Sequence, residues 1–120
     1  MRNEPRFLSN ALVYVIDESK KKTEAKLRDL SQHGLSIKSA NFINIEPNSS
    51  YGVAVIPEKE TQVGEFGLEI KSRWVKMNKL QMESGFSVLV SFNETEFNDY
   101  LEYLTKKNMV DPSPAAATGV

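Results

Sequence analysis

The sequence predicts an all-β domain, a six-stranded antiparallel β-barrel followed by one C-terminal α-helix. Three observations carry this prediction: short runs of alternating apolar and polar residues, turn-forming residues between them, and one change of period near the end of the chain. With 120 residues and 40% hydrophobic side chains, the chain has the size and composition of a single globular domain. Six short strands with hairpin-like connections favour a small barrel.

The first three expected strands differ in the spacing of their apolar residues. Residues 11–16 are apolar and β-branched, which predicts a strand buried on both faces. After a polar turn at 17–21, residues 22–30 alternate, with threonine, alanine and leucine on one face and charged residues on the other. Residues 35–38 alternate in the same way and predict the third strand.

The other three expected strands follow a turn-rich loop at residues 41–50. Residues 51–56 predict the fourth strand, and residues 66–76 predict the long fifth strand. Trp74 has the same parity as the apolar residues of that strand, which favours a side chain in the core over an exposed stacking platform. Residues 80–92 predict the last strand, with phenylalanines and valines facing inward opposite serines.

The apolar period changes from two to about 3.6 after the last expected strand. Apolar residues then recur at i, i+3, i+4 and i+7, namely Phe97, Tyr100, Leu101 and Leu104. We therefore predict a helix over 93–109 that packs this stripe on the barrel, with Asn93 and Glu96 as an N-terminal capping pair. Residues 110–120 have little apolar bulk and are expected to form a disordered tail.

The domain organisation expected is an arginine arm at residues 1–10, the barrel at 11–92, and then the helix and tail. The arm is expected to be extended because Pro5 disfavours a helix. No apolar run is long enough for a signal peptide or a membrane span, so we expect a cytoplasmic protein without membrane insertion.

Composition and charge disfavour several classes of function. The chain has no cysteine and one histidine, so we expect no disulfide and no metal site. A net charge of −1 argues against a general polyanion binder, and we expect no DNA or RNA partner. No set of nucleophile, base and metal ligands can be assembled, so we expect no catalytic residues, no enzyme activity and no cofactor.

Two short polar runs are the candidate binding residues. In the first, Arg2 and Arg6 lie four apart, and only four of the fifteen basic residues are arginines. Planar guanidinium groups are better bidentate donors than lysine, although a solvated charged terminus explains the run equally well. In the second, Asp29, Ser31 and Gly34 end one expected strand and begin the next. Such residues also form ordinary turns.

The order of these runs resembles the PilZ domain family. The resemblance rests on an RxxxR run, Arg2 and Arg6, and on a DxSxxG run, Asp29, Ser31 and Gly34, separated by two expected strands. The coarse architecture extends it over roughly residues 2–105. The resemblance implies that these five residues bind cyclic di-GMP, a bacterial second messenger, and that the chain passes the signal on to a partner protein by a conformational change.

The chemistry of this ligand fits the residue types. Guanidinium groups grip phosphates and the O6 and N7 atoms of guanine, while a carboxylate accepts from guanine N–H groups and a serine hydroxyl can donate or accept. The main alternative is a PilZ-like module that docks a protein and does not bind the nucleotide. A barrel that binds single-stranded nucleic acid is a third possibility, which the balanced charge and the expected inward-facing aromatics disfavour.

Overall fold

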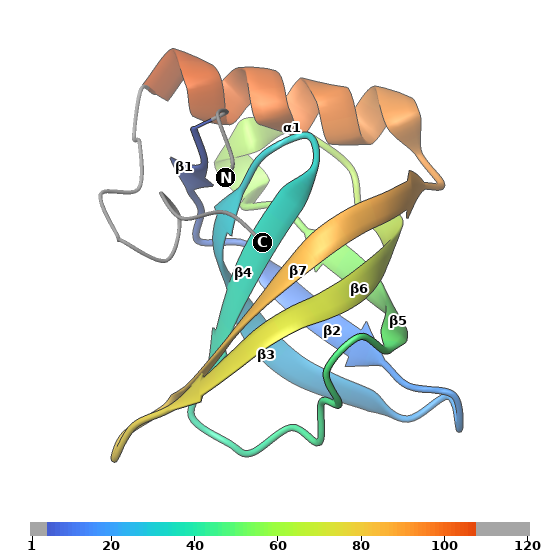
Figure 1. The fold of residues 1–120 in the computed structure, drawn as a ribbon. Coiled ribbons are helices and arrows are strands. Elements are labelled where there is room, and N and C mark those ends of the chain that lie inside the picture. Colours follow the sequence, from blue (N-terminus) through green and yellow to red (C-terminus); the bar gives the residue numbers. More distant parts are fainter. Residues whose placement is uncertain (1–4, 108–120) are drawn as a thin grey trace.

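The computed structural model describes residues 5–107, which form a closed antiparallel barrel with one helix across its end (Figure 1). The elements are β1 (Phe7–Leu8), β2 (Leu12–Ile16), β3 (Lys22–Leu30), β4 (Gly34–Ser39), β5 (Ser50–Ile56), a 3-10 turn (Lys59–Thr61), β6 (Phe66–Met77), β7 (Met82–Ser91) and α1 (Glu94–Lys107). The strand order is β1-β3-β2-β5-β6-β7-β4, and pairing of β3 with β4 closes six strands into the barrel. The predicted fold class is confirmed.

The short strand β1 was not predicted from the sequence. It pairs with the end of β3, with Phe7 opposite Leu30 and Leu8 opposite Asp29. This edge of β3 is available because β2 pairs only with residues 22–26. Edge strands gain hydrogen bonds by such pairing. The segment expected as an arm is thus fixed against β3 from Phe7 onward, whereas Arg2 and the expected tail at 110–120 lie outside the described residues.

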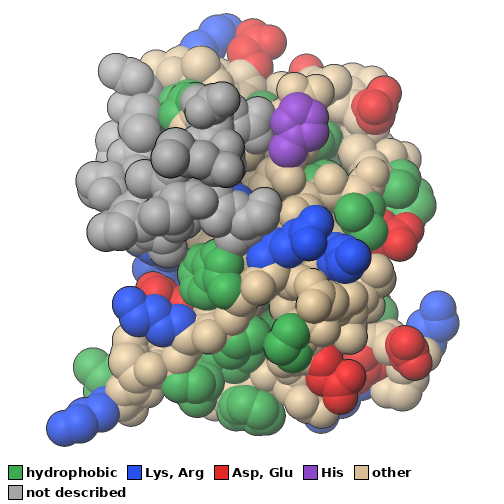
Figure 2. Space-filling view, viewed as in Figure 1, with side chains coloured by type: hydrophobic (Ala, Val, Ile, Leu, Met, Phe, Trp, Pro, Cys, Tyr) green, Lys and Arg blue, Asp and Glu red, His purple; other side chains and the backbone are tan. Residues whose placement is uncertain are grey.

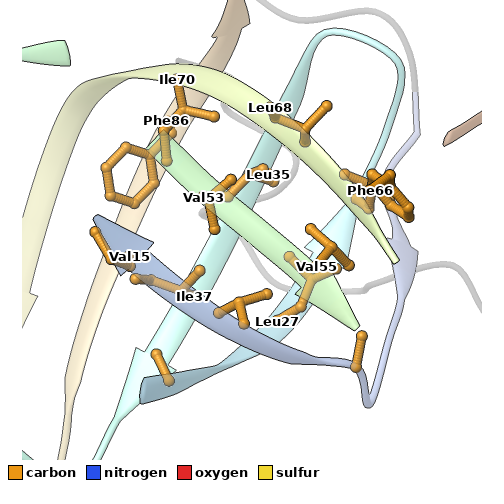
Figure 3. Close-up of a cluster of buried hydrophobic side chains, with 14 of the residues drawn as sticks. Val15, Leu27, Leu35, Ile37, Val53, Val55, Phe66, Leu68, Ile70 and Phe86 are labelled. Atoms are coloured by element: carbon orange, nitrogen blue, oxygen red, sulfur yellow. The ribbon is translucent and has the colours of Figure 1, made fainter. Parts of the chain in front are cut away.

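The core fills the barrel with the inward-facing side chains of β2 to β7 (Figure 3). The labelled side chains are Val15, Leu27, Leu35, Ile37, Val53, Val55, Phe66, Leu68, Ile70 and Phe86, and each is at most 3% exposed. Strand β2 alternates between buried and half-buried residues, so the prediction of burial on both faces is wrong. A barrel wall has one inner face, and the apolar residues on its outer face are only partly covered.

Two of the register shifts in the barrel leave an arginine as the extra residue. One shift lies between Leu27 and Asp29 on β3 and makes Arg28 the bulged residue. The other lies between Ser72 and Trp74 on β6 and makes Arg73 the bulged residue. A bulge moves every following side chain to the opposite face.

Trp74 is the residue for which this shift overturns the sequence prediction. It pairs with Gly85, which alternates with the inward-facing Ser84 and Phe86 and therefore faces outward. The expected core position of Trp74 is wrong, because its parity was counted through a strand taken as regular. Its indole lies on the outer face of the barrel and is only partly buried.

Helix α1 packs its predicted apolar stripe across the barrel end. Phe97 and Tyr100 are buried, and their rings lie 5.6 and 5.9 Å from that of Phe66. The predicted capping pair has different partners: Asn93 Oδ1 accepts from the backbone N–H of Gly67 at the start of β6. The backbone carbonyl of Asn93 accepts a hydrogen bond from the backbone N–H of Phe97. Within residues 5–107, no helix has the length and apolar character needed to span a membrane.

Candidate functional site

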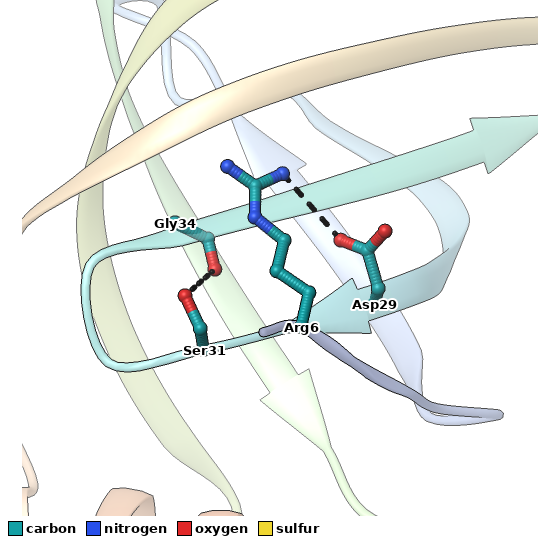
Figure 4. Close-up of polar contacts among 4 residues, drawn as sticks. All are labelled: Arg6, Asp29, Ser31 and Gly34. Carbon is teal, nitrogen blue, oxygen red and sulfur yellow. Dashed lines mark hydrogen bonds and ion pairs between the residues drawn. The ribbon is translucent and has the colours of Figure 1, made fainter. Parts of the chain in front are cut away.

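The candidate site begins with an ion pair between the segment before β1 and the end of β3. Arg6 Nη1 lies 3.6 Å from Asp29 Oδ1, and both side chains are fully buried (Figure 4). Pairing of Phe7 and Leu8 with β3 brings the two residues together, although they are far apart in sequence. Separating a buried ion pair costs more than losing an exposed one, because a charge is left without compensation.

The turn between β3 and β4 carries the other two motif residues. The backbone N–H of Ser31 donates to the carbonyl of Gly34 at 2.8 Å, and the Ser31 hydroxyl donates to the same oxygen at 3.3 Å. The backbone N–H of Val88 on β7 donates to the carbonyl of His33 at 2.9 Å. The turn is therefore closed by hydrogen bonds between its own residues and fixed to the neighbouring strand. A role in folding is enough to explain the presence of Ser31 in the motif.

Gly34 is required by close approach and not by its backbone angle. A Cβ atom at this position would collide with Arg6 Nη2 and would lie 3.0 Å from Arg6 Cζ. Its φ is outside the left-handed range that favours glycine. The Arg6 guanidinium thus packs closely against bare backbone beside the turn, which only a glycine permits.

The structure brings together four of the five residues predicted from the sequence, namely Arg6, Asp29, Ser31 and Gly34 (Figure 4). Arg2, the fifth, is outside the described residues. The described chain contains no cluster of three His, Cys, Asp or Glu side chains that could hold a metal. The assembled groups are a guanidinium, a carboxylate and a hydroxyl on the outer face of the barrel at one turn.

The outer face continues from Asp29 across three further strands. Asp29 on β3 pairs with Ser36 on β4, Ser36 pairs with Gly85 on β7, and Gly85 pairs with Trp74 on β6. In the next row, Gly34 pairs with Ser87, which pairs with Lys71. Figure 2 shows lysine and arginine side chains gathered in the middle of this face, where Figure 1 draws β6 and β7.

The residues of β6 and β7 on this face were not predicted from the sequence. One signal for them was present, because Arg73 is one of only four arginines in a chain that otherwise uses lysine. The bulge that re-aims Trp74 has no equally clear signal, since a strand with one extra residue keeps its composition. These residues were found only from the pairing register.

The segment after β1 is joined to helix α1 through Tyr100. The Tyr100 hydroxyl lies 2.6 Å from Ser9 Oγ and donates to Glu58 Oε1 at 2.7 Å. Burial, followed by the hydrogen bond to Glu58, raises the pKa of the Tyr100 phenol well above its usual value, so it stays protonated. A displacement of the segment around Arg6 would therefore act on α1 through a short buried network.

Comparison with known proteins establishes the type of fold. No protein-family model matches the sequence, and no curated protein matches it. Among solved structures, the PilZ domain of YcgR from Escherichia coli, solved with c-di-GMP, superposes with a TM-score of 0.70 at 13% identity over 90% of this chain and 95% of that domain. The Bacillus subtilis inhibitor of motility MotI superposes with a TM-score of 0.70 at 12% identity over 90% of this chain.

A third solved structure, K. pneumonia MrkH, superposes with a TM-score of 0.64 at 12% identity over 88% of this chain. The chain spans about half the length of MotI and MrkH, 52% and 49% of those chains. Together with the closed barrel and the single C-terminal helix, these superpositions show that the chain has a PilZ-type fold. The fold that the two sequence motifs implied is confirmed.

Proposed function

We propose that the chain is a receptor for cyclic di-GMP that passes the signal to a partner protein. The observation that carries the proposal is the placement of the Arg6 guanidinium against Gly34 and beside Asp29, at a turn that also holds Ser31. The similar fold of YcgR, whose PilZ domain was solved with c-di-GMP, supports the choice of ligand.

Each of these groups has a chemical role toward the ligand. The guanidinium of Arg6 can bind a phosphate or the O6 and N7 edge of guanine in a bidentate way. The carboxylate of Asp29 accepts hydrogen bonds from the N–H donors of a guanine edge, and the hydroxyl of Ser31 can exchange its bond within the turn for one to the base. Arg2 belongs to the same proposal as a second guanidinium from the arm at residues 1–10.

Binding is proposed to change the conformation around Arg6. Because Arg6 and Asp29 are buried against each other, the ligand has to take over their mutual contact. The displaced segment then acts through Ser9 and Tyr100 on α1, whose outer surface is available to a partner. In this proposal the protein is cytoplasmic and non-catalytic, and a separate protein carries out the response.

Isothermal titration with cyclic di-GMP tests the proposal. We expect saturable binding by the full chain and binding weakened roughly 10- to 150-fold by Arg6→Ala, the loss expected for one charge-assisted contact. Lys79→Ala, at the exposed far end of the β6–β7 hairpin, is the matched control and should bind normally. Absence of binding by the full chain at high ligand concentration would refute the proposal.

The alternative, a protein-docking module without a nucleotide ligand, is favoured by one observation. Arg6 and Asp29 are fully buried and within ion-pair distance of each other, so they can serve the fold alone. In that case Arg6→Ala would lower stability, while neither the full chain nor the variant would give heat on titration. The same two measurements thus separate the two functions.

A further inference from the structure

We propose that the outer face of β2, β5 and β6 is the interface of a two-fold symmetric dimer, so that the partner this face fits is a second copy of the chain. The three strands lie side by side in the barrel wall (Figure 1). Strand β5 is three strands away from β4 in either direction round the closed sheet, so this face lies across the barrel from the β3–β4 turn. The dimer therefore leaves the candidate ligand site open and does not depend on the proposed ligand.

Apolar side chains cover this face from one edge to the other. The outward residues of β2 are partly exposed and alternate with buried valines; they form a ridge, the β2 ridge, of Leu12, Tyr14 and Ile16. At the opposite edge, Val90 and Phe92 are 44% and 65% exposed. Monomeric proteins rarely expose large contiguous apolar surfaces, and such surfaces commonly mark interfaces with other proteins. The face is therefore suited to burial against a partner.

The surface between the two bulky edges is lower, because small residues form it. Gly52 and Ala54 face outward on β5, since they alternate with buried valines, and Gly67 on β6 pairs with Ala54. A Cβ atom at Gly67 would lie 3.6 Å from the ring of Phe92, so this ring borders the small residues. The face thus has a ridge and, directly beside it, a trough.

A second copy of the chain fits this relief. If one copy is turned by 180° about an axis that runs parallel to the strands between the ridge and the trough, its β2 ridge lies over the trough of the other copy. In such an interface both copies use the same surface, so the second ridge also lies over the first trough. Facing sheets pack in this way, with interdigitating side chains and a spacing of about 10 Å.

Opposite charges stand at the two ends of one row of this face. The row runs from β3 to β6 through Lys22, Ile16, Gly52 and Glu69. Neighbouring strands are about 4.8 Å apart, so three strand steps separate Lys22 from Glu69 by roughly 14 Å along the sheet, too far for an ion pair within one chain. Rotation about an axis parallel to the strands keeps each row at its level and exchanges its ends. Lys22 of one copy therefore faces Glu69 of the other.

This charge arrangement favours a second copy over a membrane as the occupant. An anionic lipid surface attracts lysine and repels a carboxylate, whereas Glu69 stands within the apolar face. In the two-fold dimer, the contact between Lys22 and Glu69 is formed twice, once on each side of the axis. Complementary charges of this kind fix the register of an interface and disfavour other partners.

The molecular mass of the full chain in solution, measured by sedimentation over a range of concentrations, tests the dimer. We expect the mass of two chains at high concentration and of one chain on dilution. Ala54→Arg places a long charged side chain in the trough of each copy and should leave the mass of one chain. Leu80→Ser is the matched control, because it removes an 85% exposed apolar side chain from the β6–β7 turn, away from this face, and should not change the mass.

Charge reversal tests the orientation of the two copies. Lys22→Glu and Glu69→Lys should each weaken association roughly tenfold, because each places like charges opposite one another on both sides of the axis. An equimolar mixture of the two variants should regain the affinity of the unmodified chain, because opposite charges then face each other again. Lys79→Glu, with the same change in net charge, should have no effect. Circular dichroism melts check that every variant folds.

Two results would overturn the proposal. The mass of one chain for the unmodified protein at high concentration would exclude the dimer, and it would do so also if a different protein is found to bind this face. A dimer that persists in Ala54→Arg and in both charge-reversal variants would exclude this face as its interface. Neither result bears on cyclic di-GMP, whose binding is measured separately by calorimetry.

Discussion

In the β3–β4 hairpin and in the β6–β7 hairpin, a planar side chain packs against a glycine, but the two regions are buried to different degrees. The first brings the Arg6 guanidinium over Gly34, and the second brings the Trp74 indole over Gly85. In both hairpins, a bulge whose extra residue is an arginine comes directly before an outward-facing residue, which is Asp29 in the first and Trp74 in the second. Asp29 of the first hairpin forms a fully buried ion pair with Arg6, whereas Trp74 of the second is only partly buried and Arg73 is exposed.

This difference in burial separates binding from stability. A buried charge that loses its partner is costly, whereas an exposed contact contributes little to folding. We therefore expect substitutions in the β3–β4 region to lower both stability and binding, and substitutions at the exposed Arg73 to have little effect on stability.

The largest expected effect is that of breaking the buried pair. Arg6→Ala removes the guanidinium that pairs with the buried Asp29 carboxylate, which should lower the free energy of unfolding by about 3–5 kcal/mol. Urea denaturation measures the change. The double variant Arg6→Met/Asp29→Leu is the control, because an apolar pair should recover most of the stability and none of the binding. A loss below about 1 kcal/mol in the single variant would contradict a structural role for the pair.

Adding a methyl group at each glycine compares the two hairpins directly. Gly34→Ala should push the Arg6 guanidinium away from Asp29 and weaken binding of cyclic di-GMP more than tenfold, while Gly85→Ala should displace the Trp74 indole and weaken binding less. Overpacking should cost about 1–3 kcal/mol of stability in each case. Calorimetry and urea denaturation measure the two effects. Equal affinities of both variants and the unmodified chain would show that neither planar group contacts the ligand.

A substitution that breaks the link from the site to α1 should have a smaller effect on binding than a substitution in the site. Tyr100→Phe removes the hydroxyl that contacts Ser9 and Glu58, at a cost of about 1–2 kcal/mol. Binding should persist, while the ligand-induced change in amide exchange of α1 should become smaller. If α1 in the unmodified chain shows no change in exchange on binding, the proposed route through Ser9 and Tyr100 is wrong.

The smallest effect is expected for a substitution in the β2–β3 turn, which serves as a control far from the site. The Asp17 carboxylate accepts from the Ser19 hydroxyl and from the Lys21 backbone, and these bonds lower its pKa. A lowered pKa stabilises the fold at neutral pH, and this stabilisation is lost as the pH falls through the folded-state pKa. Asp17→Ala should therefore lower the melting temperature slightly at neutral pH and not at strongly acidic pH, without a change in binding. A melting temperature unchanged at neutral pH would contradict this role.

The sequence predicted the regular parts of the barrel because alternation reports directly which face of a strand is buried. Val53 and Val55 on β5, or Leu35 and Ile37 on β4, could be assigned to the core in this way. The same reasoning failed for Trp74, because one extra residue in β6 reverses the parity. Strand β1 was missed because two residues carry no periodicity, and its pairing depends on the edge that β2 leaves open.

The candidate site was predictable to the extent that it follows local chemistry. Asp29, Ser31 and Gly34 belong to one turn, and their spacing alone points to it. That Arg6 reaches this turn depends on the pairing of β1 with β3, for which only the resemblance to a known family gave a signal. Ser36, Arg73 and Trp74 were missed because their proximity to the turn depends on pairings between strands distant in sequence.

The most direct test of the proposed site is a titration of the full chain with cyclic di-GMP followed by backbone amide NMR shifts. We expect the shifts to change at Arg6, at residues 30–34 and at Gly85 to Ser87, and to stay constant in the turn at residues 17–21. Shifts confined to other parts of the barrel, or no shifts at saturating ligand, would contradict binding at this site.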